Sequence, residues 1–90
     1  MGLKELAACL ESGSGGQLVV LVSYGLAAPD GFEQYTRDAL LVEVDRLKRE
    51  ALDTNRPRVL CLHVPRDTVA PVVVLRSADV VLNVTKARHG

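Results

Sequence analysis

Three residue types that hydrolases combine occur near the ends of predicted strands. Ser23 follows the apolar run 18–22, and His63 lies near the end of the run 58–64. Ligands of open parallel sheets bind beyond the carboxyl ends of the strands, so we expect Ser23 and His63 on one rim of a sheet. Asp79 would complete a Ser/His/Asp arrangement as the orienting acid. Ser23 is not in a Gly-x-Ser-x-Gly elbow, which favours the alternative that the rim residues hydrogen-bond to loops.

Two cations alternate near the C-terminus, where the chain reads Thr85-Lys86-Ala87-Arg88-His89-Gly90. Alternate side chains of a strand share a face, so Lys86 and Arg88 would lie together on one edge. Such a pair suits polyphosphate, because the arginine guanidinium forms bidentate hydrogen bonds to phosphate oxygens and lysine acts as a point charge. The alternative is an ordinary basic tail at a chain terminus.

The cysteine and histidine spacings exclude the common metal and redox motifs. Cys9 and Cys61 lie far apart, and neither His63 nor His89 has companion ligands at metal-site spacing. We therefore expect no metal site, and two small buried thiols in the reducing cytoplasm. A Cys9–Cys61 disulfide is the less favoured alternative.

The elements that must position these residues form an α/β pattern. The continuous apolar runs 18–22 and 58–64 are typical of strands covered on both faces. Between them, apolar residues at helical spacing predict a long helix over 33–52, with Asp30 and Glu33 as an acidic capping box. A shorter helix is predicted at the start of the chain by a one-sided stripe of Leu3, Leu6, Ala7 and Leu10.

The remaining segments complete the predicted organisation. An N-terminal helix within residues 1–12 is followed by a Gly/Ser-rich joint at 13–16 and an α/β core at 17–90. The C-terminal apolar runs 72–75 and 80–84 predict either a hairpin or a turn leading into one long strand. The expected fold is a small, mostly parallel sheet of three or four strands, with an N-terminal helix and one long crossover helix.

The composition fits one small folded domain, residues 1–90. Hydrophobic residues make up 48% and charged residues 24%, which argues against disorder. Lys and Arg total 11, and so do Asp and Glu, so no net field draws the chain to nucleic acid or to an anionic membrane. Two Tyr, one Phe and no Trp are too few for a base-stacking platform. We expect a cytoplasmic protein that does not bind membranes and meets nucleic acid only indirectly.

The C-terminal stretch resembles a known family. Residues 78–90 read Ala-Asp-Val-Val-Leu-Asn-Val-Thr-Lys-Ala-Arg-His-Gly, which is similar to the last core strand of RecA-fold ATPases of the DnaB replicative-helicase and KaiC-like kind. In that family the strand leads to Lys-x-Arg-x-Gly, whose cations reach the nucleotide phosphates of the neighbouring subunit. Lys86, Arg88 and Gly90 match this element. The resemblance implies phosphate binding in trans, within a homo-oligomer or beside a larger protein partner, in DNA replication or recombination.

The order strand, helix, strand over residues 17–64 is similar to that family's path from the Walker B strand to the sensor strand, with His63 near the sensor position. The chain departs from the family in having no Walker A loop, and Ser23 or Tyr24 stands where the Walker B acid belongs. A hydroxyl cannot supply the charge that holds the Mg²⁺-bound water. The resemblance thus implies an incomplete RecA-like module that is no ATPase by itself, with ATP and Mg²⁺ bound at a partner.

Two other functions stay open. The chain could be a small non-enzymatic α/β scaffold or protein-interaction module that buries a sheet edge in a homodimer, or a small hydrolase that uses Ser23 and His63. The RecA-like function predicts nucleotide-dependent association that Arg88→Ala weakens. The scaffold predicts association indifferent to ATP, lost when an apolar edge residue such as Val73 becomes Lys. The hydrolase predicts ester turnover that Ser23→Ala abolishes.

Overall fold

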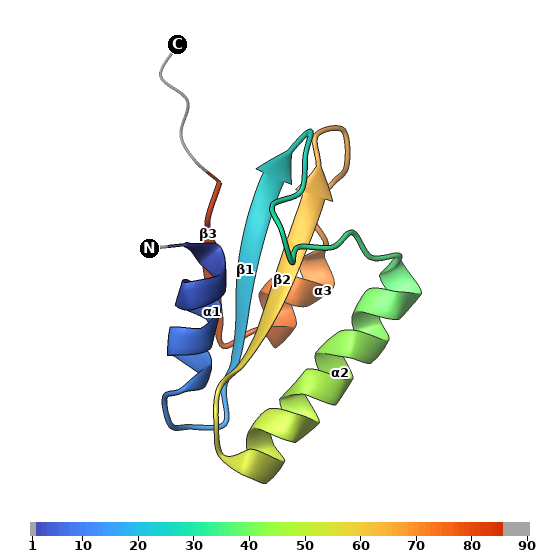
Figure 1. Cartoon of the computed structure of the whole chain (residues 1–90). Helices are drawn as coiled ribbons and strands as arrows, with labels where there is room; N and C mark the ends of the chain where they lie inside the picture. The colour runs from blue at the N-terminus through green and yellow to red at the C-terminus, as the bar shows by residue number, and fades with distance from the viewer. Residues whose placement is uncertain (1, 86–90) are drawn as a thin grey trace.

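The computed structural model describes residues 2–85. Its elements are α1 (Leu3–Glu11), β1 (Leu18–Gly25), α2 (Arg37–Thr54), β2 (Arg58–Pro65), α3 (Val72–Ser77) and β3 (Val80–Asn83) (Figure 1). The three strands form one parallel sheet in the order β2-β1-β3. The predicted α/β class, the parallel sheet, the N-terminal helix and the long crossover helix are confirmed.

β1 is the central strand, and its continuous apolar run is explained by burial on both faces. Leu18, Val20 and Val22 pack in the cluster under α2 and α3. Val19 and Leu21 pack in a second cluster under α1. All five side chains are at most 3% exposed. An alternating apolar and polar pattern would have left one of these two clusters without its centre.

The helices cover the sheet from both sides, with α1 on one face and α2 and α3 on the other (Figure 1). The apolar stripe of α1 packs against β1 and β2, as its spacing predicts. α2 is held to the opposite face by its buried residues Leu40, Val44, Leu47 and Ala51. Within residues 2–85, the helices lack the combination of length and apolar character that crossing a bilayer requires.

The long helix begins later than predicted. α2 starts at Arg37 rather than Glu33, and Thr36 rather than Asp30 caps it. The Thr36 hydroxyl accepts a hydrogen bond from the Ala39 N–H at 3.2 Å, which satisfies one of the free donors of the first turn.

The residues before α2 serve the sheet instead of the helix. Phe32 is buried in the α1-side cluster. Glu33 pairs with the outer edge of β2, where its N–H donates to the Cys61 carbonyl at 3.3 Å and its own carbonyl accepts from the His63 N–H at 2.8 Å. This pairing explains why the helix cannot include Glu33, and it covers part of one edge of the sheet.

The prediction of a hairpin or one long strand over 72–84 is wrong, because residues Val72–Ser77 form the helix α3. β2 and β3 run parallel, so the chain must return along the sheet between them, and a helix makes that return. Val74 lies on the buried side of α3 and is 1% exposed. Its burial outweighs the strand preference of consecutive valines. Val73 therefore lies on a helix and not on a sheet edge.

The Gly/Ser segment 13–16 is fixed against the end of α2. The Gly15 N–H donates to the Asn55 carbonyl at 3.0 Å. A Cβ on Gly16 would lie 2.8 Å from the Ala51 carbonyl oxygen, so only glycine permits this close approach. The segment turns the chain tightly from α1 into β1.

Candidate functional site

The structure brings Ser23 and His63 together. They are register partners on β1 and β2, close to the carboxyl ends of both strands. Ser23 is 4% exposed and His63 is 1% exposed, so neither side chain is accessible to a substrate in the folded chain. The two residues share a rim as predicted, but they lie below its surface.

The His63 ring has a structural partner. Its Nε2 lies 3.0 Å from the Gly25 carbonyl, and because a carbonyl only accepts, Nε2 carries the hydrogen. Nδ1 is buried, and no residue among 2–85 hydrogen-bonds to it. The imidazole therefore ties the end of β1 to β2. The role is structural, as the alternative predicted, but the partner is the last residue of a strand and not a loop.

Asp79 lies at the opposite end of the sheet from Ser23 and His63. Its carboxylate accepts from the Leu18 N–H at 2.8 Å, and its own N–H donates to the Leu18 carbonyl at 2.9 Å. Ser23 stands five residues further along β1, a distance of about 16 Å in a strand. The predicted Ser/His/Asp arrangement is therefore wrong, and Asp79 instead joins the start of β3 to the start of β1.

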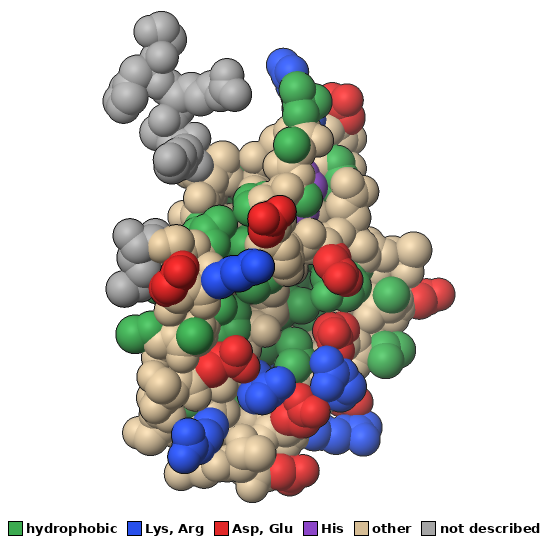
Figure 2. Space-filling view, viewed as in Figure 1, with side chains coloured by type: hydrophobic (Ala, Val, Ile, Leu, Met, Phe, Trp, Pro, Cys, Tyr) green, Lys and Arg blue, Asp and Glu red, His purple; other side chains and the backbone are tan. Residues whose placement is uncertain are grey.

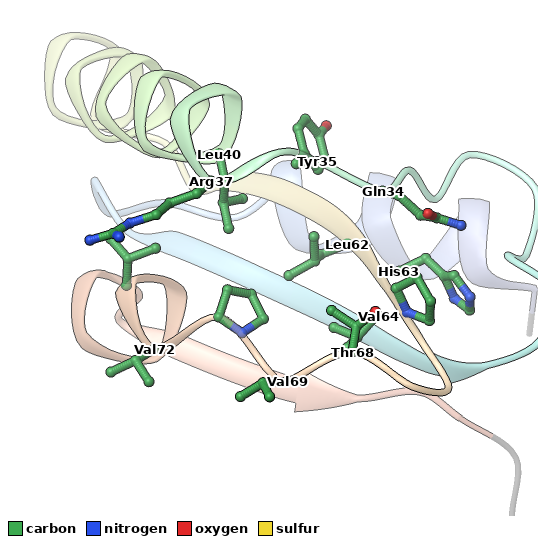
Figure 3. Close-up of a pocket in the computed structure, with 13 residues that line it drawn as sticks. Gln34, Tyr35, Arg37, Leu40, Leu62, His63, Val64, Thr68, Val69 and Val72 are labelled. Carbon is green, nitrogen blue, oxygen red and sulfur yellow. The ribbon is translucent and has the colours of Figure 1, made fainter.

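A cavity of about 520 Å³ opens where the start of α2, the end of β2 and α3 meet (Figure 3). Its volume is that of a small-ligand pocket, about 300–1,000 Å³. Figure 3 shows Gln34 and His63 at one end and Arg37 and Val72 at the other. The lining is mostly apolar, and burial raises the pKa of the Tyr35 phenol, with the charge of Glu33 adding to the effect. The cavity can hold an apolar group, and among the described residues that line it no nucleophile hydrogen-bonds to a base.

The two predicted phosphate ligands, Lys86 and Arg88, lie outside the described residues, as does Gly90. The chain immediately before them is attached to β1, because the Tyr24 N–H donates to the Thr85 hydroxyl at 2.7 Å. All strands are parallel, so this attachment lies at the carboxyl edge of the sheet.

β3 exposes apolar side chains on both of its faces. Val80, Val81 and Leu82 are 37%, 38% and 38% exposed. Val80 and Leu82 pair in register with α1-facing residues of β1, whereas Val81 pairs with a residue that faces α2 and α3. Basic and acidic side chains are intermixed on the face shown in Figure 2. Residues 80–85, by contrast, contain no basic or acidic side chain.

Among residues 2–85, one side of the β3 backbone has no neighbouring strand. The Val84 N–H donates to the Val22 carbonyl at 2.9 Å, and Val22 pairs in register with Asn83. In a parallel ladder, alternate residues direct their N–H and C=O to the same neighbour. The peptide groups of Leu82 and Val84 thus point toward β1, and those of Val81 and Asn83 point away from it.

The two edges of the sheet differ in their protection. Glu33 covers part of the outer edge of β2. Natural edge strands are commonly protected by charged residues or proline, and residues 80–85 have neither. We name residues 80–85 with their outward peptide groups the β3 edge, and it is the candidate functional site.

The thiols and acidic groups add no second chemical site. The prediction of two buried thiols is wrong, because Cys9 is exposed and Cys61 is only half-buried; both are free. Burial raises the pKa of the Cys61 thiol, with a smaller contribution from Glu11. Within residues 2–85, no three His, Cys, Asp or Glu side chains are grouped closely enough to hold a metal ion.

Family models, curated proteins and solved structures give no match to this chain. The site is therefore defined by its geometry. Sequence reasoning predicted a strand at 80–84 but missed that it is an edge strand, because the position of a strand in a sheet depends on pairing. The uncharged run from Val80 to Thr85 gives no signal of an edge position, because it has the composition of an interior strand.

Proposed function

We propose that this chain is a non-enzymatic α/β interaction module that binds another polypeptide by adding a strand of it to the β3 edge. The observation that carries the proposal is an edge strand that is apolar on both faces and has outward peptide groups at Val81 and Asn83. Strand addition of this kind obtains affinity from main-chain hydrogen bonds and specificity from alternate side chains.

The energetics of the edge favour a partner strand. An added strand would supply partners for the N–H and C=O groups of Val81 and Asn83, and each such bond contributes about 0.5–1.5 kcal/mol. The same strand would cover Val80, Val81 and Leu82, which are more than a third exposed. Both gains come from one ligand geometry, an extended peptide lying in the plane of the sheet.

The non-enzymatic part of the proposal is supported by the burial of Ser23 and His63 and by the distance of Asp79 from both. We also propose a cytoplasmic location, which is supported by the two free thiols, because such thiols persist in a reducing compartment.

Site-specific photo-crosslinking in cells tests this function. A photoreactive side chain at Val81 should form a covalent adduct with a protein chain, and Asn83→Pro in the same molecule should remove that adduct. The control position is Lys48, which is exposed on α2 far from the sheet edge. An absence of adducts from position 81, or equal adducts from position 48, would overturn the proposal.

A second candidate, the incomplete RecA-like module that gives cations to nucleotide bound by a partner, is favoured by one observation. Thr85 is anchored to Tyr24 at the carboxyl edge of the sheet, where parallel sheets bind ligands. Lys86 and Arg88 follow Thr85 directly in the sequence. This function predicts that Mg-ATP strengthens association measured by light scattering. Arg88→Ala should remove that effect, and Arg49→Ala, on exposed α2, should preserve it.

A further inference from the structure

We infer that the strand added at the β3 edge is β3 of a second copy of this chain, antiparallel and centred on Leu82. This inference rests on the proposed function, because it names the partner of the same edge. It is carried by the self-complementarity of residues 79–85 in hydrogen bonding, in side-chain faces and in charge.

The hydrogen-bonding pattern selects the register. When Leu82 lies on the two-fold axis, Val81 stands opposite Asn83 of the second copy, and Asn83 stands opposite its Val81. These residues carry the outward peptide groups, and each antiparallel pair of this kind exchanges two N–H···O=C bonds. The outward groups of Val81 and Asn83 are thereby satisfied in both copies. A register centred on Val81 would instead pair Asn83 with Asp79, whose N–H already bonds to β1.

The side-chain faces agree with the same register. Directly opposite residues must lie on one face of a continuous sheet, and a slip of one residue would reverse that face. Centring on Leu82 pairs it with its own copy and pairs Val80 with Val84, all on the α1 face. The central pair is of the closer, non-hydrogen-bonded type, in which side chains contact most intimately.

The charges permit the contact. The register sets Asp79 of one copy opposite Thr85 of the other, and the two Asp79 residues stand at opposite ends of the paired strands. The Thr85 oxygen accepts from Tyr24, which leaves its hydroxyl hydrogen free to donate to a carboxylate. No like charges meet along residues 80–85, since these residues contain none.

Disulfide trapping reports both the partner and the register. In a Cys9→Ser, Cys61→Ala background, Leu82→Cys would place two Cα atoms about 4.5 Å apart across the axis, close to the separations of about 4.4–6.8 Å that disulfides span. Val81→Cys is the matched control, because it is equally exposed but lies about 8 Å from its own copy. We expect mild oxidation to yield covalent dimer from Leu82→Cys at least tenfold faster than from Val81→Cys.

A second measurement does not depend on cysteine. Light scattering of the unaltered chain should show a concentration-dependent dimer, and Val81→Pro should be monomeric while keeping its fold. Dimer trapped as fast through position 81 as through position 82 would overturn the register. A monomer at every concentration with no trapped dimer would overturn the inference. In that case, photo-crosslinked adducts between position 81 and a different protein in cells would still support the proposed function. An absence of such adducts would overturn both the proposed function and the inference.

Discussion

Proline at two adjacent positions of β3 should affect the folded monomer very differently. Val81 directs its N–H away from the sheet, whereas the ladder assigns the Leu82 N–H to the Val20 carbonyl. Proline removes the N–H at either position. The two side chains are apolar and each is 38% exposed, so the loss of side-chain burial is closely matched. The difference between Val81→Pro and Leu82→Pro therefore measures the direction of the peptide groups.

The expected loss of folding free energy follows from the backbone groups that each proline leaves without a hydrogen-bond partner. Leu82→Pro removes one ladder hydrogen bond and leaves a carbonyl without a partner at Val20, which is 0% exposed, so water cannot reach it easily. The combined loss is about 2–4 kcal/mol. Val81→Pro removes no internal bond and restricts the unfolded chain, so its effect should stay within about 1 kcal/mol. Since each kcal/mol moves the Tm of a domain this small by about 4–8 °C, Leu82→Pro should lower it by roughly 10–30 °C.

The assay is urea and thermal unfolding followed by circular dichroism at low protein concentration, so that self-association does not contribute. Val81→Ala and Leu82→Ala provide the side-chain corrections, because they keep both N–H groups. Equal losses for the two proline variants would contradict the assignment of inward and outward groups, and a larger loss for Val81→Pro would show that it is reversed. Either result would also overturn the register centred on Leu82, which depends on that assignment.

Three further predictions concern the fold around the site. Gly16→Ala should lower the free energy of unfolding by about 1–3 kcal/mol, because its Cβ would meet a backbone carbonyl of α2, whereas Gly13→Ala should change it much less in the same urea titration. Thr36→Ala should lower it by about 1 kcal/mol through loss of the α2 cap, and an unchanged midpoint would contradict that role. Exposed Cys9 should be alkylated by iodoacetamide near pH 8 faster than Cys61, whose pKa is raised by burial; mass spectrometry of the modified peptides reads the order.

Much of the fold was predictable because single strands and helices here obey local patterns. The continuous apolar run of β1 requires cover on both faces, and the structure supplies α1 on one side and α2 on the other. The exceptions are segments whose structure is decided by distant partners. Val72–Val74 favour a strand locally, but the parallel sheet needs a crossover there, and burial of Val74 stabilises a helix.

The site was predictable only as far as strand direction determines it. Parallel strands bring their carboxyl ends together, which predicts that Ser23 and His63 are neighbours. Asp79 could not be placed in the same way, because it precedes its strand and lies at the amino edge. Nothing local in the sequence shows that β3 is an outer strand, since that depends on β1 pairing with β2 on one side and β3 on the other.

The exposed area of the β3 edge sets the strength of the association. Burying the remaining third or so of Val80, Val81 and Leu82 contributes about 0.6–1 kcal/mol for each side chain. With two copies and four interstrand hydrogen bonds, the gross gain is about 6–12 kcal/mol, against an association cost of about 4–15 kcal/mol. The β3 edge alone therefore supports a weak, concentration-dependent pair. The second proposed function instead makes association depend on a nucleotide bound by a partner and contacted by Lys86 and Arg88. The two proposed functions therefore differ in whether association of the chain depends on nucleotide.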